Sequence, residues 1–527
     1  MADTEYDGII LGAGHNSLVL QAYLGRAGLK SVCLERRPVA GGGLSTVEDS
    51  RRPGFFHNTH SFYHRAINQM PWYKDLHLEQ LGASYLEPEL NVALILRNGQ
   101  ALEWWTDFER TIESAAAFSK KDALTLRRWR DEFVPILEHI LLTESQSPPV
   151  PQDIRSENLQ RTSEGRRLLE VAKLSPFEFV EREFEHPVIR AGLLFFNGLR
   201  EVDPRVPGFG YHVPALLASR HKAQMCVGGS ANLAKALVSA VMKSGGEIRL
   251  NTTPRKIHVE NGRTVGVETS HGDFIRARHF VVSGLNPVQT FVDLLDPGSL
   301  PLEWREKAGS FLFNVLAPLF AINVNLKEPP HYAAEERHPE LSRAFMTIVG
   351  LEDSAQFLDI VRKHEEGAIP PAVMWGSCPT LFDPSQAPQG FHTAFMWEKL
   401  PYRLRGDANN WDGERDRHAR QMLDVWTEYA PNLKSSLLDY SAQSPLDTER
   451  TLPNMRHGDL LVGALSNGQT GYNRPFADAG LYRGYFSNLY LCGSSSHPGG
   501  NITGLPGYNC AQVLLNDLGL SFDDVRQ

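Results

Sequence analysis

Residues 7–35 read DGIILGAGHNSLVLQAYLGRAGLKSVCLE and decide the fold. The segment opens with an apolar strand over Asp7–Leu11, continues with a helix-like pattern over Ser17–Ala27, and closes with a second strand over Lys30–Leu34. Gly28 stands where the C-cap of the helix belongs. A strand, a helix and a strand within about 30 residues form a βαβ unit, so we expect an α/β protein built on a parallel sheet.

The turn between the first strand and the helix carries a G-x-G-x-x-S variant of the dinucleotide-binding fingerprint, Gly12-Ala13-Gly14-His15-Asn16-Ser17. The glycines allow backbone N–H groups to approach a pyrophosphate closely, and the helix N-terminus favours that anion electrostatically. Glu35 follows Gly14 by 21 residues, where its carboxylate can accept hydrogen bonds from both ribose hydroxyls and would repel a 2′-phosphate. A glycine-rich turn that binds nothing is the alternative. The predicted cofactor contacts here are Gly12, Gly14, His15, Asn16 and Glu35.

A second glycine-rich segment, RRPVAGGGLST, follows this acid directly over residues 36–46. Consecutive glycines let the backbone lie against a cofactor, and Ser45 and Thr46 offer hydroxyl groups to phosphate oxygens. Nicotinamide-only Rossmann proteins do not need a second loop of this kind, so the segment points to FAD. A surface loop without a ligand is the alternative. The predicted contacts are Arg36, Gly42, Gly43, Leu44 and Ser45.

The last motif, LYLCGSSSHPGGNITGLPGYN, lies near the C-terminus over residues 489–509. A strand that ends at a glycine and a helix that begins near Gly504 offer backbone amides and a positive dipole end to a phosphate or to the pyrimidine edge of a flavin. We therefore predict that the two chain ends build one cofactor site. His497 either assists catalysis near the flavin or packs beside Pro498, and both interpretations stay open.

Composition restricts the class of protein. The 527 residues are 42% hydrophobic and 22% charged, which is ordinary for a folded globular chain, and the net charge of −9 argues against a nucleic-acid partner. The five cysteines are far apart and show no metal-ligand spacing, so we expect no metal and a reduced, cytoplasmic compartment.

The sequence shows neither a secretory signal nor an apolar run long enough to span a membrane. The longest apolar stretch, Phe311–Val324, is interrupted by Asn314 and Pro318, and we expect it to form buried strands. Monotopic membrane contact is left open.

The three motifs, together with Val227–Leu237 and the strand pair after it, resemble the bacterial phytoene desaturase family of FAD-dependent oxidoreductases. The C-terminal motif is most similar to the subgroup that contains pyridine nucleotide-disulfide oxidoreductase domain-containing protein 2. The resemblance implies a monoamine-oxidase-like α/β architecture, with a discontinuous, Rossmann-like FAD-binding domain and a substrate domain of mixed sheet and helices. The implied domains are residues 1–65, 220–300 and 450–527 for FAD, and residues 66–219 and 301–449 for the substrate.

The resemblance also implies individual roles. Glu35 would hold the adenosine ribose, and Gly12 and Gly14 would hold the pyrophosphate. The other implied contacts are Pro254 at the adenine, Gly493 beside the ribityl chain, and Ile502, Thr503 and Gly504 beside the isoalloxazine.

One segment departs from the pattern of carotenoid desaturases. After Pro53-Gly54-Phe55 that family usually continues with an acidic residue and a glycine close to the flavin, where this chain has Asn58 and His60. The departure argues against a carotenoid substrate. His60 is a candidate base or orienting donor, because an imidazole titrates near neutral pH. The alternative is that His57, His60 and His64 are partly exposed loop residues without a chemical role.

The sequence therefore predicts an FAD-dependent oxidoreductase that desaturates or otherwise dehydrogenates a small to medium-sized, apolar molecule by hydride transfer to the flavin. The candidate catalytic residues are His60 and His497. A flavin amine oxidase is the second hypothesis, and a nicotinamide dehydrogenase is the third. A flavin-binding structural or regulatory protein is the non-enzymatic one. Oxygen and a quinone both stay open as electron acceptors, as do the direction of the reaction and the oligomeric state.

Overall fold

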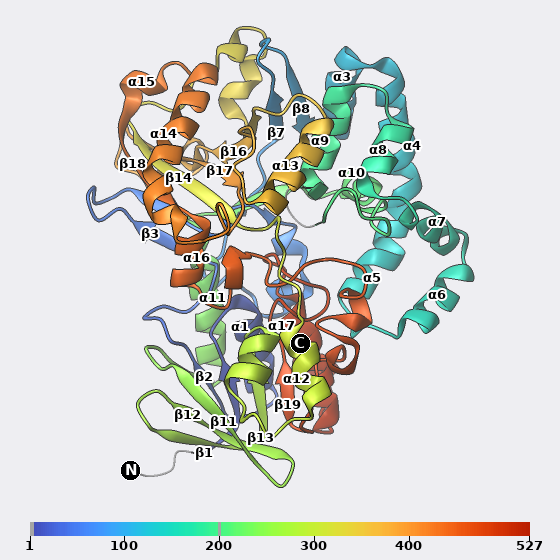
Figure 1. Ribbon diagram of the computed structural model, residues 1–527, viewed down its shortest axis with the longest axis vertical. Coiled ribbons are helices and arrows are strands. Elements are labelled where there is room, and N and C mark those ends of the chain that lie inside the picture. The colour runs from blue at the N-terminus through green and yellow to red at the C-terminus, as the bar shows by residue number, and fades with distance from the viewer. Residues whose placement is uncertain (1–4, 199–201, 527) are drawn as a thin grey trace.

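The computed structural model describes residues 5–198 and 202–526. Two seven-stranded sheets lie toward opposite ends of its long axis, and helices pack around each of them (Figure 1). The predicted α/β class with mixed sheets is confirmed. The division into two domains stays a proposal, and residues 1–4, 199–201 and 527 of the predicted domains lie outside the described residues.

The first sheet is built on the predicted βαβ unit. Strand β1 (Glu5–Leu11) pairs in parallel with β2 (Ser31–Leu34) and with β13 (Phe274–Ser283), and helix α1 (His15–Arg26) connects β1 to β2. Strand β19 (Leu489–Leu491) pairs in parallel with β13, so the C-terminal motif leaves this sheet next to the N-terminal one. The order is β10-β2-β1-β13-β12-β11, with β19 paired to β13 off this path.

The remaining strands of this sheet are β10 (Glu247–Arg249), β11 (Pro254–Glu260) and β12 (Arg263–Thr269). Turns at Asn261-Gly262 and His271-Gly272 join β11 to β12 and β12 to β13.

Three helices cover one face of the first sheet: α1, α11 (Ala231–Lys243) and α17 (Leu505–Asp517). Ile10 of β1 packs in their cluster, whereas Ile9 and Leu11 belong to the cluster on the other face, as the alternation of a strand requires. Helix α17 is the predicted C-terminal helix, and Gly504 is its N-cap. It crosses α1 so closely that a Cβ on Gly507 would overlap the carbonyl oxygen of Asn16.

The second sheet has the order β18-β14-β17-β16-β15-β7-β8. Only β15 and β7 pair in parallel, and the other neighbours are antiparallel. Buried strand is found from Leu319 onward, whereas residues 311–318 form a loop, so the expectation for Phe311–Val324 was right only in part. The strands are β7 (Leu90–Ile95), β8 (Ala101–Trp105), β14 (Leu319–Leu326), β15 (Met346–Val349), β16 (Met374–Ser377), β17 (His392–Lys399) and β18 (Leu437–Gln443).

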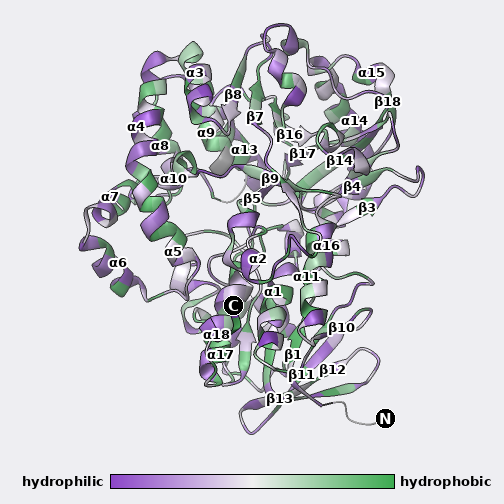
Figure 2. Ribbon diagram, turned by 180° about the vertical axis from the view of Figure 1, so that it is seen from behind, coloured by the Kyte–Doolittle hydropathy of each residue, from purple (hydrophilic) through white to green (hydrophobic). Residues whose placement is uncertain are grey.

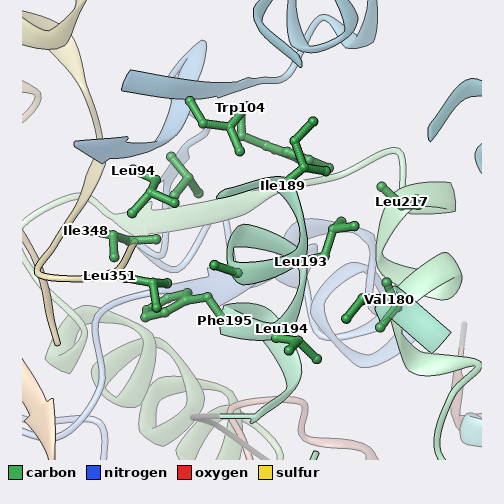
Figure 3. Packing of buried hydrophobic residues seen from close by; sticks show 14 of the residues in the cluster. Leu94, Trp104, Val180, Ile189, Leu193, Leu194, Phe195, Leu217, Ile348 and Leu351 are labelled. Carbon is green, nitrogen blue, oxygen red and sulfur yellow. The ribbon is translucent and has the colours of Figure 1, made fainter. Parts of the chain in front are cut away.

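Helices form a layer beside the β8 edge of this sheet (Figure 1). In Figure 3, helix α9 lies between the sheet residues Leu94, Trp104 and Ile348 on one side and Val180 and Leu217 on the other. The helical stretch that begins at Phe108 is divided at Ser119. The helices are α3 (Phe108–Phe118), α4 (Lys120–Ile136), α5 (Leu142–Ser145), α6 (Gln152–Gln160), α7 (Ser163–Ala172), α8 (Pro176–Glu183), α9 (Pro187–Gly198) and α10 (His212–Ala218).

A three-stranded sheet of β5 (His64–Arg65), β9 (Ala223–Cys226) and β6 (Tyr85–Leu86) lies between the two large sheets (Figure 2). In the part of the chain that the structure describes, no helix is both long and apolar enough to cross a membrane.

The crossing of α1 and α17 gives a stability prediction. Gly507→Ala would force the two helices apart, and overpacking of this kind costs about 1–3 kcal/mol of the free energy of unfolding. Gly413→Ala in α14 (Asn410–Tyr429) is the matched control, because its Cβ would meet nothing within 4 Å and alanine favours a helix. Urea unfolding should show a lower midpoint for Gly507→Ala alone. Equal midpoints for the two variants would contradict the close packing.

Candidate active site

The first turn of α1 is the place where distant segments of the chain meet. Gly14 forms a β-bridge with Gly41, whose N–H donates to the carbonyl of Ala13 at 2.7 Å. A Cβ on Gly284, after β13, would overlap the hydroxyl of Ser17, and a Cβ on Gly493, after β19, would lie 2.5 Å from the Gly284 carbonyl oxygen. The predicted glycine loops and the C-terminal motif therefore surround one helix end.

A cavity of about 160 Å³ opens at this turn, between the two large sheets. Its first group of lining residues is mostly backbone and small polar side chains: Gly14, His15, Asn16, Ser17, Gly42, Gly43, Gly284, Gly493, Ser494, Asn501 and Ile502. Its second group is apolar and aromatic: Phe62, Tyr63, Leu319, Trp375, Trp397, Leu452, Met455, Leu460, Leu461 and Val462. The second sheet supplies Leu319, Trp375 and Trp397.

The N-terminus of α1 is suited to an anion. Its N-cap, Gly14, has no side chain, no other side chain caps it, and the first turn holds no acidic residue. The helix dipole and the unpaired amides of this turn therefore present partial positive charge at the cavity. His15 Nε2 and Asn16 Oδ1 are buried without a hydrogen-bond partner, as polar atoms that a ligand satisfies would be. These features fit the pyrophosphate of a dinucleotide.

Glu35 directly follows β2 and is buried. Its carboxylate accepts one hydrogen bond from each of the two glycine-containing segments. Its Oε2 accepts from the N–H of Ala13 and its Oε1 from the N–H of Arg37, each at 2.9 Å. A carboxylate has about four acceptor positions, so two are left for ribose hydroxyls. Pro254 begins β11 close by, since the N–H of Thr252 donates to the carbonyl of Glu35 at 2.8 Å.

The structure separates the predicted cofactor contacts into two sets. Gly14, His15, Asn16, Gly42, Gly43, Gly493 and Ile502 line the cavity. Gly12, Glu35, Arg36, Leu44, Ser45, Pro254, Thr503 and Gly504 lie outside its lining.

Two residues of the second set, Leu44 and Thr503, make contacts within the protein that stabilise the fold. Leu44 is buried in the apolar cluster under α1, and the Thr503 carbonyl accepts from the Trp72 indole at 2.6 Å. Arg36 is exposed, whereas its neighbour Arg37 donates to the Gly42 carbonyl at 3.1 Å. The arginine that contacts the cavity lining is therefore Arg37, which the sequence did not single out. The cofactor roles of the whole set stay proposals.

His60 lines the cavity, and its place beside a flavin stays a prediction. Its Nε2 accepts from the Gln443 side-chain amide, and its Nδ1 bonds the Thr59 hydroxyl, both at 2.8 Å. Burial, and then the charge of Arg37, lowers the pKa of His60 to about 4, so the expected titration near neutral pH is wrong. The alternative of partly exposed loop histidines is also wrong for His57 and His64, which are both buried.

His497 does not line the cavity. Its Nε2 bonds the carbonyl oxygen of Glu144 in α5 at 2.9 Å, and its own carbonyl accepts from the Tyr482 hydroxyl at 2.8 Å. Burial lowers its pKa to about 4. The contact of His497 with Glu144 thus joins the C-terminal motif to the helical layer, which is a structural role away from the cavity lining.

Sequence reasoning missed several lining residues. Ser61, Phe62 and Tyr63 directly follow His60, so the segment that departs from the family pattern could have drawn attention to them. Trp375, Trp397 and Lys399 come from strands without a recognisable motif, and no sequence signal marked them.

Comparisons with known proteins agree with this architecture. The family model described as "Flavin containing amine oxidoreductase" matches residues 22–388. A limonene dehydrogenase chain from Castellaniella defragrans is 29% identical, over 98% of this chain and 95% of that protein. Pyridine nucleotide-disulfide oxidoreductase domain-containing protein 2 from Rattus norvegicus is also 29% identical, over 98% and 94%. A lycopene-forming phytoene desaturase from Paracoccus sp. is 23% identical, over 97% of each chain. The resemblance found in the sequence is thus confirmed.

Solved structures show the same fold at low sequence identity. Putrescine oxidase bound to putrescine has a TM-score of 0.62 and 13% identity, with 98% of this chain and 99% of that chain covered. Cyclohexylamine oxidase from Brevibacterium oxydans has a TM-score of 0.58 and 14% identity at the same coverage.

Gly14→Ala tests the anion site at α1. Gly14 has φ −71° and ψ 164°, which alanine adopts freely, and a Cβ there would meet no protein atom within 4 Å. The methyl group would enter the space over the helix N-terminus, so we expect an unchanged unfolding midpoint and about tenfold weaker FAD binding, close to the 1–2 kcal/mol of one lost hydrogen bond. Titration of the apoprotein with FAD, followed by flavin fluorescence, measures the affinity. Unchanged affinity would remove this turn from the cofactor site.

Four histidines with lowered pKa values give a pH prediction. Burial lowers the pKa of His15, His60 and His497 to about 4 and that of His64 to about 3. Each is protonated below about pH 6.5 in the unfolded chain but stays neutral in the folded protein, so stability is lost as the pH falls from about 6.5 toward 4. The free energy of unfolding should be lower at pH 5 than at pH 7 by about 2 kcal/mol or more. Urea midpoints that do not change between these pH values would show that the histidines are not buried in neutral form.

Proposed function

Because this chain belongs to the family of flavin-containing amine oxidoreductases, we propose that it is an FAD-dependent dehydrogenase or desaturase of a neutral, apolar organic molecule of small to medium size. Membership makes it a flavin oxidoreductase of the amine oxidase and phytoene desaturase superfamily. The identity of the flavin as FAD and the class of substrate are the proposal. When bound, the flavin supplies a two-electron acceptor for hydride.

We infer the class of substrate from the charged side chains that line the cavity. Within the described residues its lining includes no aspartate or glutamate. Its one lysine, Lys399, donates through Nζ to the carbonyl of Ala317 at 2.7 Å and lies 5.8 Å from the ring centre of Trp375. The lining therefore offers a substrate ammonium group no carboxylate to pair with and places the Lys399 side chain beside it. The cavity therefore favours a neutral molecule over a protonated amine.

The aromatic lining supports the same conclusion. The ring of Tyr63 packs edge to face against that of Trp397, with 5.8 Å between the ring centroids. The ring of Phe62 packs in the same way against Tyr63, with 4.9 Å between the centroids. Contacts of this kind hold the rings in fixed positions, so they can orient an apolar molecule and keep water away from the reacting carbon. The amides of the first turn of α1 and the carboxylate of Glu35 would hold the cofactor against them.

The relatives add support from their names alone. Limonene and phytoene, for which two of the relatives are named, are neutral hydrocarbons. Flavin amine oxidation is the second candidate, because the family model carries that description and putrescine oxidase shares the fold. The missing carboxylate makes it the weaker one.

Anaerobic reduction of the flavin separates the two. The purified protein should be yellow and release FAD on denaturation. Limonene and related cyclic hydrocarbons are the first probes, and we expect one of them to bleach the flavin absorbance without oxygen, while putrescine and cyclohexylamine leave it unchanged. Re-oxidation by oxygen or by a quinone then identifies the electron acceptor.

Two results would contradict the proposal. Bleaching by an amine but by no hydrocarbon, with hydrogen peroxide and a carbonyl product in air, would show an amine oxidase. A colourless protein that takes up no FAD would remove the flavin chemistry altogether.

A further inference from the structure

Three side chains form a hydrogen-bonded chain that starts at the wall of the cavity. Ser61 lines the cavity, and its Oγ lies 2.6 Å from Nε2 of His64. Nδ1 of His64 lies 2.8 Å from the hydroxyl of Tyr85. In this arrangement a serine hydroxyl is hydrogen-bonded to one nitrogen of an imidazole, and a third group is hydrogen-bonded to the other nitrogen. Such an arrangement activates a serine by giving its proton an acceptor.

The direction of these hydrogen bonds depends on the tautomer of His64, and the contact of Tyr85 with Cys226 favours one of the two tautomers. The hydroxyl of Tyr85 also bonds the thiol of Cys226. If the phenol proton points to that sulfur, the phenol oxygen accepts from Nδ1–H of His64, and Nε2 is left to accept the proton of Ser61. In this arrangement the Ser61 hydroxyl, Nδ1–H of His64 and the Tyr85 hydroxyl each donate one hydrogen bond, and each bond points away from the cavity.

The small sheet between the two large ones fixes these groups. His64 lies on β5 opposite Gln224 of β9, and Tyr85 lies on β6 opposite Cys226 of the same strand. His64 is fully buried, and burial lowers its pKa to about 3, so the imidazole is neutral in the neutral pH range and would hold a proton only transiently. Burial also raises the pKa of Tyr85, which keeps the phenol protonated.

The other polar groups of the cavity are less suited to take up a proton. The Nε2 lone pair of His60 already accepts from Gln443. Lys399 is an ammonium and has no lone pair to offer. His15 belongs to the first turn of α1, where the pyrophosphate is proposed to lie.

We propose that Ser61, His64 and Tyr85 take up the proton that the substrate loses when it is oxidised, an assignment that rests on the proposed function. In dehydrogenation across a C–C bond, one carbon loses a hydride to the flavin and its neighbour loses a proton, whose bonding electron pair becomes the double bond. The proton goes to Oγ of Ser61 while the hydroxyl proton of Ser61 moves to Nε2 of His64. Tyr85 holds the resulting imidazolium through Nδ1–H, and His64 gives the proton to water after the product leaves. Ser61 is the catalytic residue of this relay, and His64 and Tyr85 act through it.

Phenylmethylsulfonyl fluoride tests the relay without a substrate and without turnover of the flavin. In this reaction a bond forms between Oγ of Ser61 and sulfur, the S–F bond breaks, fluoride leaves, and the proton of Ser61 goes to His64. Mass spectrometry of the tryptic peptide that ends at Arg65 measures the rate of labelling. We expect labelling to be about tenfold slower in His64→Gln and about threefold slower in Tyr85→Phe.

Ser494 is the internal control, because it lines the same cavity but its Oγ accepts from Asn16 Nδ2 at 3.2 Å and bonds no imidazole of the described residues. It should stay unlabelled in the wild-type protein. Equal rates for Ser61 in the wild type and His64→Gln, equal rates for Ser61 and Ser494, or no label on Ser61 would each overturn the relay. Near-UV circular dichroism shows whether His64→Gln folds. If it does not fold, Tyr85→Phe, which removes one oxygen atom only, is the variant that tests the relay.

Because the labelling needs no hydride transfer, its result can be separated from that of the proposed function. A protein that no hydrocarbon reduces but whose Ser61 reacts in a His64-dependent way would keep the relay and lose the substrate class. The reverse result would keep the substrate class and lose the relay.

Discussion

The close approach of backbone segments to the first turn of α1 is the constraint on which the rest of the structure depends. Gly507 lets α17 cross the carbonyl of Asn16, Gly284 leaves room for Ser17, and Gly493 packs on Gly284. None of these contacts leaves space for a side chain, so strands β13 and β19 and helix α17 must converge there. The same turn is uncapped, and its partial positive charge makes it a site for an anion.

The two sheets contribute different chemistry to the cavity between them. The first sheet and its connections bring backbone amides, glycines and short polar side chains, which suit a phosphorylated cofactor. The second sheet brings Leu319, Trp375, Trp397 and Lys399, which suit a neutral apolar molecule and disfavour a cation. The small sheet of β5, β9 and β6 lies at the junction and carries His64 and Tyr85. The proposed hydride and proton transfers would therefore use groups from three separate sheets, each held by its own hydrogen bonds.

Most of the features that sequence analysis predicted are local ones, and the meeting of the two chain ends at one helix end is the long-range exception. Residues 7–35 contain a complete βαβ unit, and the terminal glycine motif shows its strand and helix directly, so both could be recognised without knowing their neighbours. The properties of the histidines could not be recognised in this way. The pKa of His60 depends on burial, and its Nε2 is bonded to Gln443, which is 383 positions away. The aromatic residues of the cavity lining could not be predicted for the same reason. Pairing of β16 with β17 brings Trp375 and Trp397 to the cavity, and no local motif marks this pairing.

The most direct test of this account is a crystal structure of the purified protein with its bound flavin. We expect FAD with its pyrophosphate against the amides of the first turn of α1, its ribose on Glu35, and its isoalloxazine in the cavity that Ser61, Phe62 and Trp397 line. A flavin bound elsewhere, or a pyrophosphate that makes no contact with that turn, would contradict the claim that the meeting of the glycine segments at α1 creates the active site.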